Sequence, residues 1–175
     1  MISSIKNLKI NLESKILNTN NTFIIAHNNI DLDGFGAAVG LSLIPTYFGK
    51  HAYIVIDEND FSMDTLVQTI IEEKCEHFKF LTKDECLDYV TGNDLLILTD
   101  VNKKSRIALG DSLDKFSEIM VVDHHEIDSD SVSLDNAGIF PEASSASEIV
   151  TNLLRLFQIK YDENVATALL AGINL

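Results

Sequence analysis

The sequence predicts an α/β fold with a doubly wound, mostly parallel sheet flanked by helices. Two observations support this fold class: short apolar runs alternate with helical patterns along the chain, and several of the runs end abruptly in polar residues. The 175 residues, of which 46% are hydrophobic, are enough for one domain with a sizeable core.

The elements follow from apolar periodicity and from the residues that punctuate it. Strands are expected at 22–26, 51–56, 78–81, 95–99 and 118–122, with one short edge strand in the polar segment 126–141. Helices are expected at 4–17, 63–74 and 83–90, with a short one within 103–116. A further helix should begin at Gly36 and be ended or kinked by Pro45. The last two should run from the capping box at 145–148 to about Phe157, and from Asp162 onward.

Polar side chains follow three of the expected strands at once. His27 follows the first, Asp100 follows 95–99, and Asp123-His124-His125 follows 118–122. In an open parallel sheet the carboxyl ends of the strands share one edge, where ligands bind, so these residues should converge there. Asp31 and Asp33, in the loop after His27, should join them.

Such a group of acids would raise its own pKa values unless cations neutralised it. Mixed His and Asp ligands suit Mn²⁺, Zn²⁺ or Fe²⁺, and the carboxylate-rich set without a thiolate favours Mn²⁺, as a pair of ions. The alternative is structural: the aspartates cap helices or form turns, and the histidines are satisfied core residues. That reading is plausible for any one residue but not for all of them together. Gly34-Phe35-Gly36 lacks the pattern of a nucleotide-phosphate loop.

Charge and composition exclude several classes of function. A net charge of −14 argues against binding long nucleic acid, although a small anionic substrate is compatible with bound divalent cations. No stretch is apolar enough to span a bilayer and no signal peptide is evident, so a cytoplasmic location is expected. Cys75 and Cys86 are expected to be reduced structural residues.

The motifs together resemble those of the DHH phosphoesterase superfamily. They are His27-x-Asn29-x-Asp31-x-Asp33, the aspartate at 100, VVDHH at 121–125, and the segments EASSASEIVTNLL at 142–154 and ATALLAGI at 166–173. The last two segments resemble GdpP-type cyclic-di-AMP phosphodiesterases and their nanoRNase relatives. Ile30 stands where the family usually has proline.

This resemblance implies roles for individual residues. The implied Mn²⁺ ligands are His27 and Asp31 for one ion, Asp33 and His124 for the other, and Asp100 as a bridge between the two. His125 would contact the scissile phosphate and Asp123 would orient the histidine pair, while a hydroxide between the two metals attacks phosphorus.

The resemblance further implies a manganese-dependent phosphodiesterase that acts on a cyclic dinucleotide of the c-di-AMP type or on a short oligonucleotide. Alternatives are a nanoRNase or pAp phosphatase, less favoured a pyrophosphatase or RecJ-type exonuclease, and, from another class, a non-catalytic module that binds metal or nucleotide. Residues 1–21 are expected to be an N-terminal helix and linker, and 22–175 a DHH domain.

The chain ends at Leu175, before the family's fourth-motif aspartate and the substrate-gripping DHHA1 domain. We therefore expect a fragment of a larger enzyme, in which membrane segments could lie outside this chain. The second ion is expected to bind weakly here, and the fragment itself could be inactive.

Overall fold

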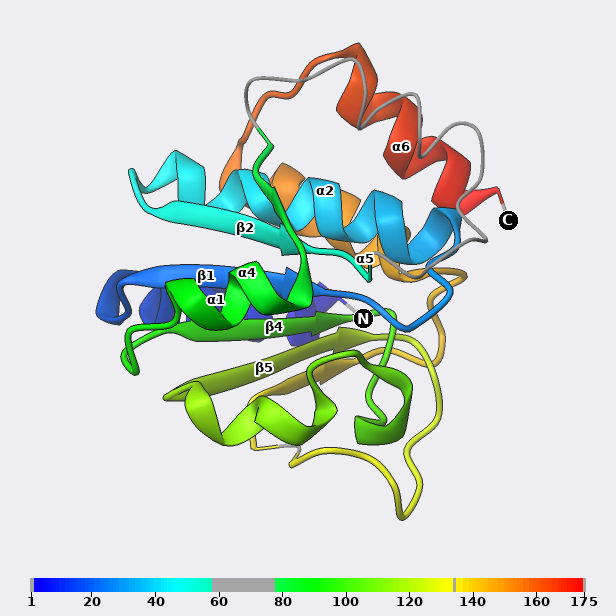
Figure 1. The fold of residues 1–175 in the computed structure, drawn as a ribbon. Coiled ribbons are helices and arrows are strands. Elements are labelled where there is room, and N and C mark those ends of the chain that lie inside the picture. Colours follow the sequence, from blue (N-terminus) through cyan, green and yellow to red (C-terminus); the bar gives the residue numbers. More distant parts are fainter. Residues whose placement is uncertain (1, 58–77, 134, 175) are drawn as a thin grey trace.

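The computed structural model describes residues 2–57, 78–133 and 135–174. The helix expected at 63–74, and Cys75, lie outside these residues. Within them the α/β class is confirmed, because six strands form one sheet in which every pairing is parallel, and helices cover both faces (Figure 1).

The sheet has the order β3-β2-β1-β4-β5-β6. Its strands are β1 Asn21–Ile25, β2 His51–Val55, β3 Phe80–Leu81, β4 Leu95–Thr99, β5 Glu118–Asp123 and β6 Ala137–Ile139. The direction of winding reverses between β1 and β4, which is the position where doubly wound folds open a ligand crevice at the carboxyl ends of the strands.

Two layers of helices enclose the sheet. They are α1 Ile2–Asn18, α2 Leu32–Tyr47, α4 Lys83–Tyr89, α5 Ala146–Phe157, α6 Glu163–Ile173 and the short 3-10 helices η1 Lys104–Arg106 and η2 Gly110–Lys115. Core residues of α1, α2 and α5 pack on one face of the sheet and α6 packs on α2 and α5, whereas α4, η1, η2 and the loops beside them cover the other face.

The apolar runs are continuous because both faces of the sheet are buried. In β4, Leu95 and Ile97 contribute to the core under α2 and α5, while Leu96 and Leu98 face the opposite layer. All four are fully buried. The predicted strands were therefore recognisable from composition alone, without the alternation that marks a half-exposed strand.

The start of α2 was predicted four residues too late. The helix begins at Leu32, because the Asp31 carboxylate accepts hydrogen bonds from the backbone N–H groups of Asp33 and Gly34, both at 3.0 Å. Pro45 does not end the helix, which continues to Tyr47. The cap places Asp31 and Asp33 at the start of α2 and so fixes the positions of these two carboxylates.

Small residues of α2 and α6 allow close contact among α2, α5 and α6. A Cβ atom on Gly36 would lie 2.4 Å from the Ala168 carbonyl oxygen, and one on Gly172 would lie 2.3 Å from Ser147 Oγ. These approaches bring the amino end of α5 and the last turn of α6 against the start of α2.

Candidate metal centre

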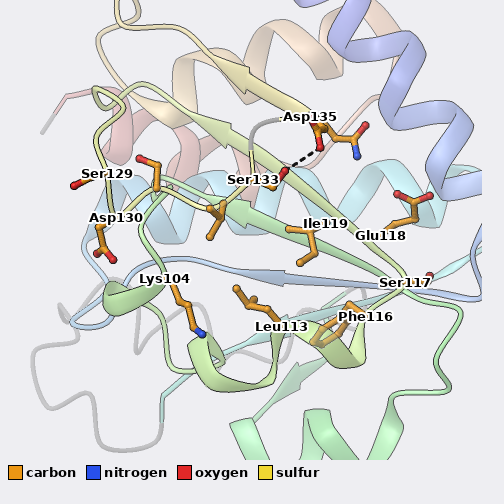
Figure 2. Close-up of a pocket in the computed structure, with 13 residues that line it drawn as sticks. Lys104, Leu113, Phe116, Ser117, Glu118, Ile119, Ser129, Asp130, Ser133 and Asp135 are labelled. Carbon is orange, nitrogen blue, oxygen red and sulfur yellow. Dashed lines mark hydrogen bonds between the residues drawn. The ribbon is translucent and has the colours of Figure 1, made fainter.

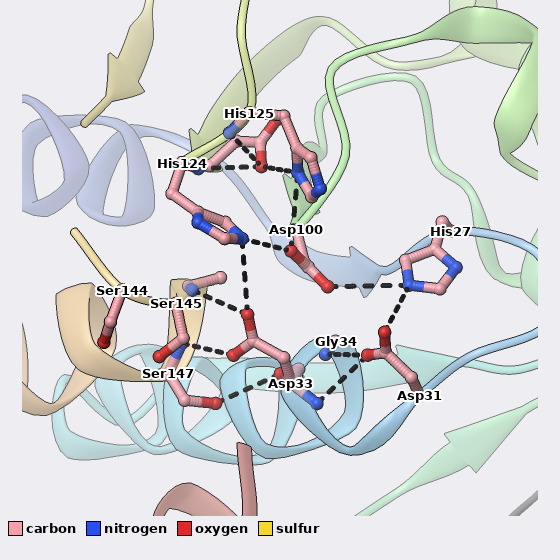
Figure 3. A network of polar contacts seen from close by, with 12 residues as sticks. His27, Asp31, Asp33, Gly34, Asp100, His124, His125, Ser144, Ser145 and Ser147 are labelled. Atoms are coloured by element: carbon pink, nitrogen blue, oxygen red, sulfur yellow. Dashed lines mark hydrogen bonds and ion pairs between the residues drawn. The ribbon is translucent and has the colours of Figure 1, made fainter. Parts of the chain in front are cut away.

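All seven residues predicted for the site meet at the carboxyl edge of the sheet (Figure 3). They come from the β1–α2 loop and the first turn of α2, from the residue after β4, and from the end of β5. They are His27, Asp31, Asp33, Asp100, Asp123, His124 and His125.

The first group of ligating atoms surrounds His27. Its Nε2 lies 3.5 Å from Asp31 Oδ2 and 3.5 Å from Asp100 Oδ2. The other ring nitrogen, Nδ1, lies 2.8 Å from the Asn28 carbonyl oxygen, which can only accept a hydrogen bond, so Nδ1 carries a proton. Nε2 is therefore the nitrogen available to a cation.

The second group surrounds His124. Its Nε2 lies 3.3 Å from Asp100 Oδ1 and 3.6 Å from Asp33 Oδ2. The two oxygens of Asp100 thus face different groups, Oδ2 toward His27 and Oδ1 toward His124. Asp100 is therefore the one carboxylate shared by both sets of possible metal ligands among the described residues.

Asp100 is held in an unfavourable setting. The side chain is 3% exposed, and Oδ1 is a buried oxygen that accepts no hydrogen bond from the described residues. Its backbone φ of 56° is in the left-handed region, as is that of Asn29 at 57°, which asparagine tolerates better than most residues. Strain and an unsatisfied buried oxygen at the same residue are typical of a functional site.

Asp33 is anchored by the amino end of α5. The backbone N–H groups of Ala146 and Ser147 donate to its two carboxylate oxygens, each at 2.8 Å. The expected cap of α5 is confirmed, since Ser145 Oγ accepts from the Glu148 N–H at 3.0 Å, although the Glu148 side chain returns to Ser144 and not to Ser145. Sequence reasoning missed the bond between this helix end and Asp33.

Asp123 lies fully buried behind the histidine pair. Its Oδ1 accepts hydrogen bonds from the His124 N–H at 2.8 Å, the His125 N–H at 3.2 Å and His125 Nδ1 at 2.8 Å. Its Oδ2 accepts from Asn102 Nδ2 at 2.8 Å. Asn102, which is 1% exposed, is a residue of the site that the sequence did not reveal, because an asparagine three residues after a strand is an ordinary loop residue.

Neighbouring side chains of the cluster shift one another's pKa values. Hydrogen bonds with Asp100 and Asp31 raise the pKa of His27 from 6.5 to about 10. Burial raises the pKa of Asp31, but the His27 and backbone contacts outweigh it and the net pKa is lowered. Burial, and then the charge of Asp100, raise the pKa of Asp33. In the metal-free protein a proton on His27 supplies part of the positive charge that the carboxylates require.

These donors fit a divalent cation. Within the described residues, two sets could each hold an ion: His27, Asp31 and Asp100 form one, and Asp100, Asp123, His124 and His125 form the other. Asp33, which was predicted to share the second ion with His124, belongs to neither set, although its Oδ2 lies 3.6 Å from His124 Nε2. Both sets offer only imidazole nitrogen and carboxylate oxygen. That donor chemistry suits Mn²⁺, Zn²⁺ or Fe²⁺ better than a thiolate-seeking ion.

The cleft over the cluster has a volume of about 280 Å³ and is also lined by Arg106, Ser144, Ser145 and Gly172. A larger pocket, of about 500 Å³, lies elsewhere, between η2 and the loop 129–136 (Figure 2). None of the predicted site residues and no histidine line it. The chemistry of the molecule is therefore assigned to the smaller cleft.

The fold and this edge-of-sheet cluster define a known class of protein. Residues 21–173 match the sequence model of the DHH family, N-terminal domain, and the chain therefore belongs to that family. Among the described residues, no helix combines the length and the apolarity needed to cross a membrane.

Particular relatives are similar over most of the chain. The cyclic-di-AMP phosphodiesterase GdpP of Bacillus subtilis is 32% identical over 170 residues, and the cyclic-di-AMP phosphodiesterase PdeA of Listeria monocytogenes is 31% identical over 169. Each alignment covers 93% of this chain but only 25% of the relative. The chain thus spans about a quarter of the length of these proteins.

The fold also occurs in a solved structure. An exopolyphosphatase-related protein from Bacteroides fragilis superposes with a TM-score of 0.72 at 17% sequence identity, covering 99% of this chain and 49% of that one. At this identity the likeness concerns the fold alone.

Proposed function

We propose that this chain is the metal-binding catalytic part of a cytoplasmic, Mn²⁺-dependent phosphodiesterase that hydrolyses a cyclic dinucleotide of the c-di-AMP type or a short oligonucleotide. The observation that supports it best is the placement of Asp100, whose two oxygens face two separate groups of ligating atoms. The names of the GdpP and PdeA relatives support the substrate class.

Under this proposal His27 and Asp31 would hold one ion, Asp33 and His124 would hold a second, and Asp100 would be a ligand of both. Divalent cations in such a site polarise phosphoryl oxygens and activate water. The protein's own contribution is to keep these ligands fixed, through the Asn28 carbonyl on His27 and the amino end of α5 on Asp33.

His125 is the proposed contact to the scissile phosphate. Its side chain is 47% exposed and lines the cleft, while Asp123 fixes its Nδ1 at 2.8 Å. Nε2 has no hydrogen-bond partner among the described residues and is available to a phosphate oxygen. Asp123 acts through His125 and the adjacent backbone, so it is a positioning residue.

We further propose that residues 22–175 form the DHH domain and that the whole protein carries a substrate-gripping domain of the DHHA1 type. The length of the relatives, of which this chain covers 25%, supports such an addition. Substrate selection is then shared between the cleft described above and that domain.

The test is hydrolysis of bis(p-nitrophenyl) phosphate and of a cyclic dinucleotide in the presence and absence of Mn²⁺. We expect Mn²⁺-dependent turnover that is lost in Asp100→Ala and retained in Asp111→Ala, a matched change at a fully exposed side chain. A version extended beyond Leu175 is assayed in parallel. Metal binding without turnover by both lengths of chain would instead establish the non-catalytic module.

A further inference from the structure

A second pocket adjoins the cleft that holds the metal-ligand cluster. Its volume is about 230 Å³, and it lies between the segments 100–106 and 125–128. Asp100, Arg106 and His125 line both hollows, so a molecule bound at the cluster can extend into this second pocket. The exposed side chain of Ile127 adds apolar surface to it.

Arg106 is the cation at the junction of the two hollows. Its backbone is fixed, since its carbonyl oxygen accepts from the Asn28 N–H at 2.7 Å and its own N–H donates to the Lys103 carbonyl at 3.1 Å. The guanidinium is exposed and makes no ion pair with a described carboxylate. Lys103, the other cation that lines the second pocket, is already paired with Asp128.

This placement matters because the surrounding charge is negative. Three carboxylates and three imidazoles line the first cleft, and Glu126 and Asp128 line the second pocket. Cations at the cluster would compensate one phosphate group. A second phosphate entering the adjoining pocket would meet carboxylates unless Arg106 received it, and the planar guanidinium matches phosphate oxygens in a bidentate manner.

We propose that Arg106 binds a second phosphate group of the substrate, and that the pocket between 100–106 and 125–128 is the subsite for it. Arg106 is then a specificity-determining residue that favours dinucleotides with two phosphates over diesters with one. This inference rests on the proposed phosphodiesterase function and adds a substrate feature to it.

The experiment is a binding cycle between one protein group and one ligand group. The probes are a linear adenylate dinucleotide with and without its terminal 5′-phosphate. Their dissociation constants are measured by calorimetry with the full chain in Ca²⁺, with chromatography to verify that the ligands stay intact. The proteins are the unmutated chain, Arg106→Gln, Arg106→Lys, and Arg155→Gln at the chain's other, exposed arginine on α5.

We expect the unmutated chain and Arg155→Gln to favour the phosphorylated ligand about tenfold, which is the usual scale of one charge-assisted contact. Arg106→Gln should abolish that preference, and Arg106→Lys should restore part of it. A preference that survives in Arg106→Gln, or one that is absent from the unmutated chain, overturns the subsite. Circular dichroism verifies that the variants are folded.

The two proposals fail in different ways. If Mn²⁺ produces no hydrolysis although the phosphate preference depends on Arg106, the subsite stands and the phosphodiesterase is lost. If hydrolysis occurs but the phosphate preference does not depend on Arg106, the phosphodiesterase proposal stands and the subsite is rejected.

Discussion

The buried hydrogen bonds of Asp123 allow a sharp prediction for Asp123→Asn. Three N–H groups point at Oδ1 and one, from Asn102, points at Oδ2. The new amide should keep its oxygen toward the three donors and place its NH₂ group against the Asn102 NH₂ group. The Asn102 amide cannot flip to present its oxygen without breaking the hydrogen bond that its Oδ1 accepts from Ser131 Oγ at 2.8 Å.

The expected cost follows from this arrangement. Losing one buried hydrogen bond to a charged group should lower the free energy of unfolding by about 2 kcal/mol. For a chain of this size that lowers the melting temperature by roughly 4–8 °C. His125 Nδ1 retains an oxygen acceptor, so its tautomer is preserved. Turnover should still fall by about 10–100-fold, which is the usual loss when a residue that supports metal-site ligands is changed.

Thermal unfolding of the metal-free protein and Mn²⁺-dependent hydrolysis of a model diester measure the two effects. Asp111→Asn, at a fully exposed aspartate, is the control and should change stability by less than about 0.5 kcal/mol. In the swapped pair Asp123→Asn with Asn102→Asp, the amide again faces an acceptor, so part of the stability should return. An unchanged melting temperature in Asp123→Asn would refute the reasoning.

Three further predictions follow from the packing and the charges. Gly36→Ala should lower the free energy of unfolding, measured in urea, by about 1–3 kcal/mol, because its Cβ meets the Ala168 backbone. Gly40→Ala should lower it by less, since its Cβ meets only the ends of side chains. Equal losses of stability in the two variants would contradict this prediction. In the metal-free protein His27 is protonated below its pKa of about 10 and must lose that proton to bind a cation, so the affinity for Mn²⁺ should rise by up to about tenfold per pH unit. Calorimetry in two buffers of different ionisation enthalpy should show that metal binding releases a proton. If no proton is released, the assignment of His27 as a ligand is contradicted. Burial raises the pKa of Cys86 to about 12, so peptide mapping should find this thiol unmodified after alkylation of the native protein, and rapid labelling would show that α4 opens.

Local physical signals were sufficient for most of the secondary structure. The apolar runs of β1, β4 and β5 are unbroken because helices cover both faces of the sheet, and the caps at Ser145 and Asp162 lie where the side-chain chemistry indicated. The start of α2 was misplaced because the glycines after Asp33 masked a helix whose first turn depends on the Asp31 cap.

The sequence by itself also determined which side chains reach the functional edge, since a parallel sheet aligns the carboxyl ends of its strands. Only the tertiary structure decided that the oxygens of Asp100 divide between two groups, that α5 anchors Asp33, that Asn102 supports Asp123, and that Arg106 stands where two pockets join. Those relations depend on side-chain directions and on contacts between residues distant in the chain. No local pattern encodes them, because each is set by how the layers pack together.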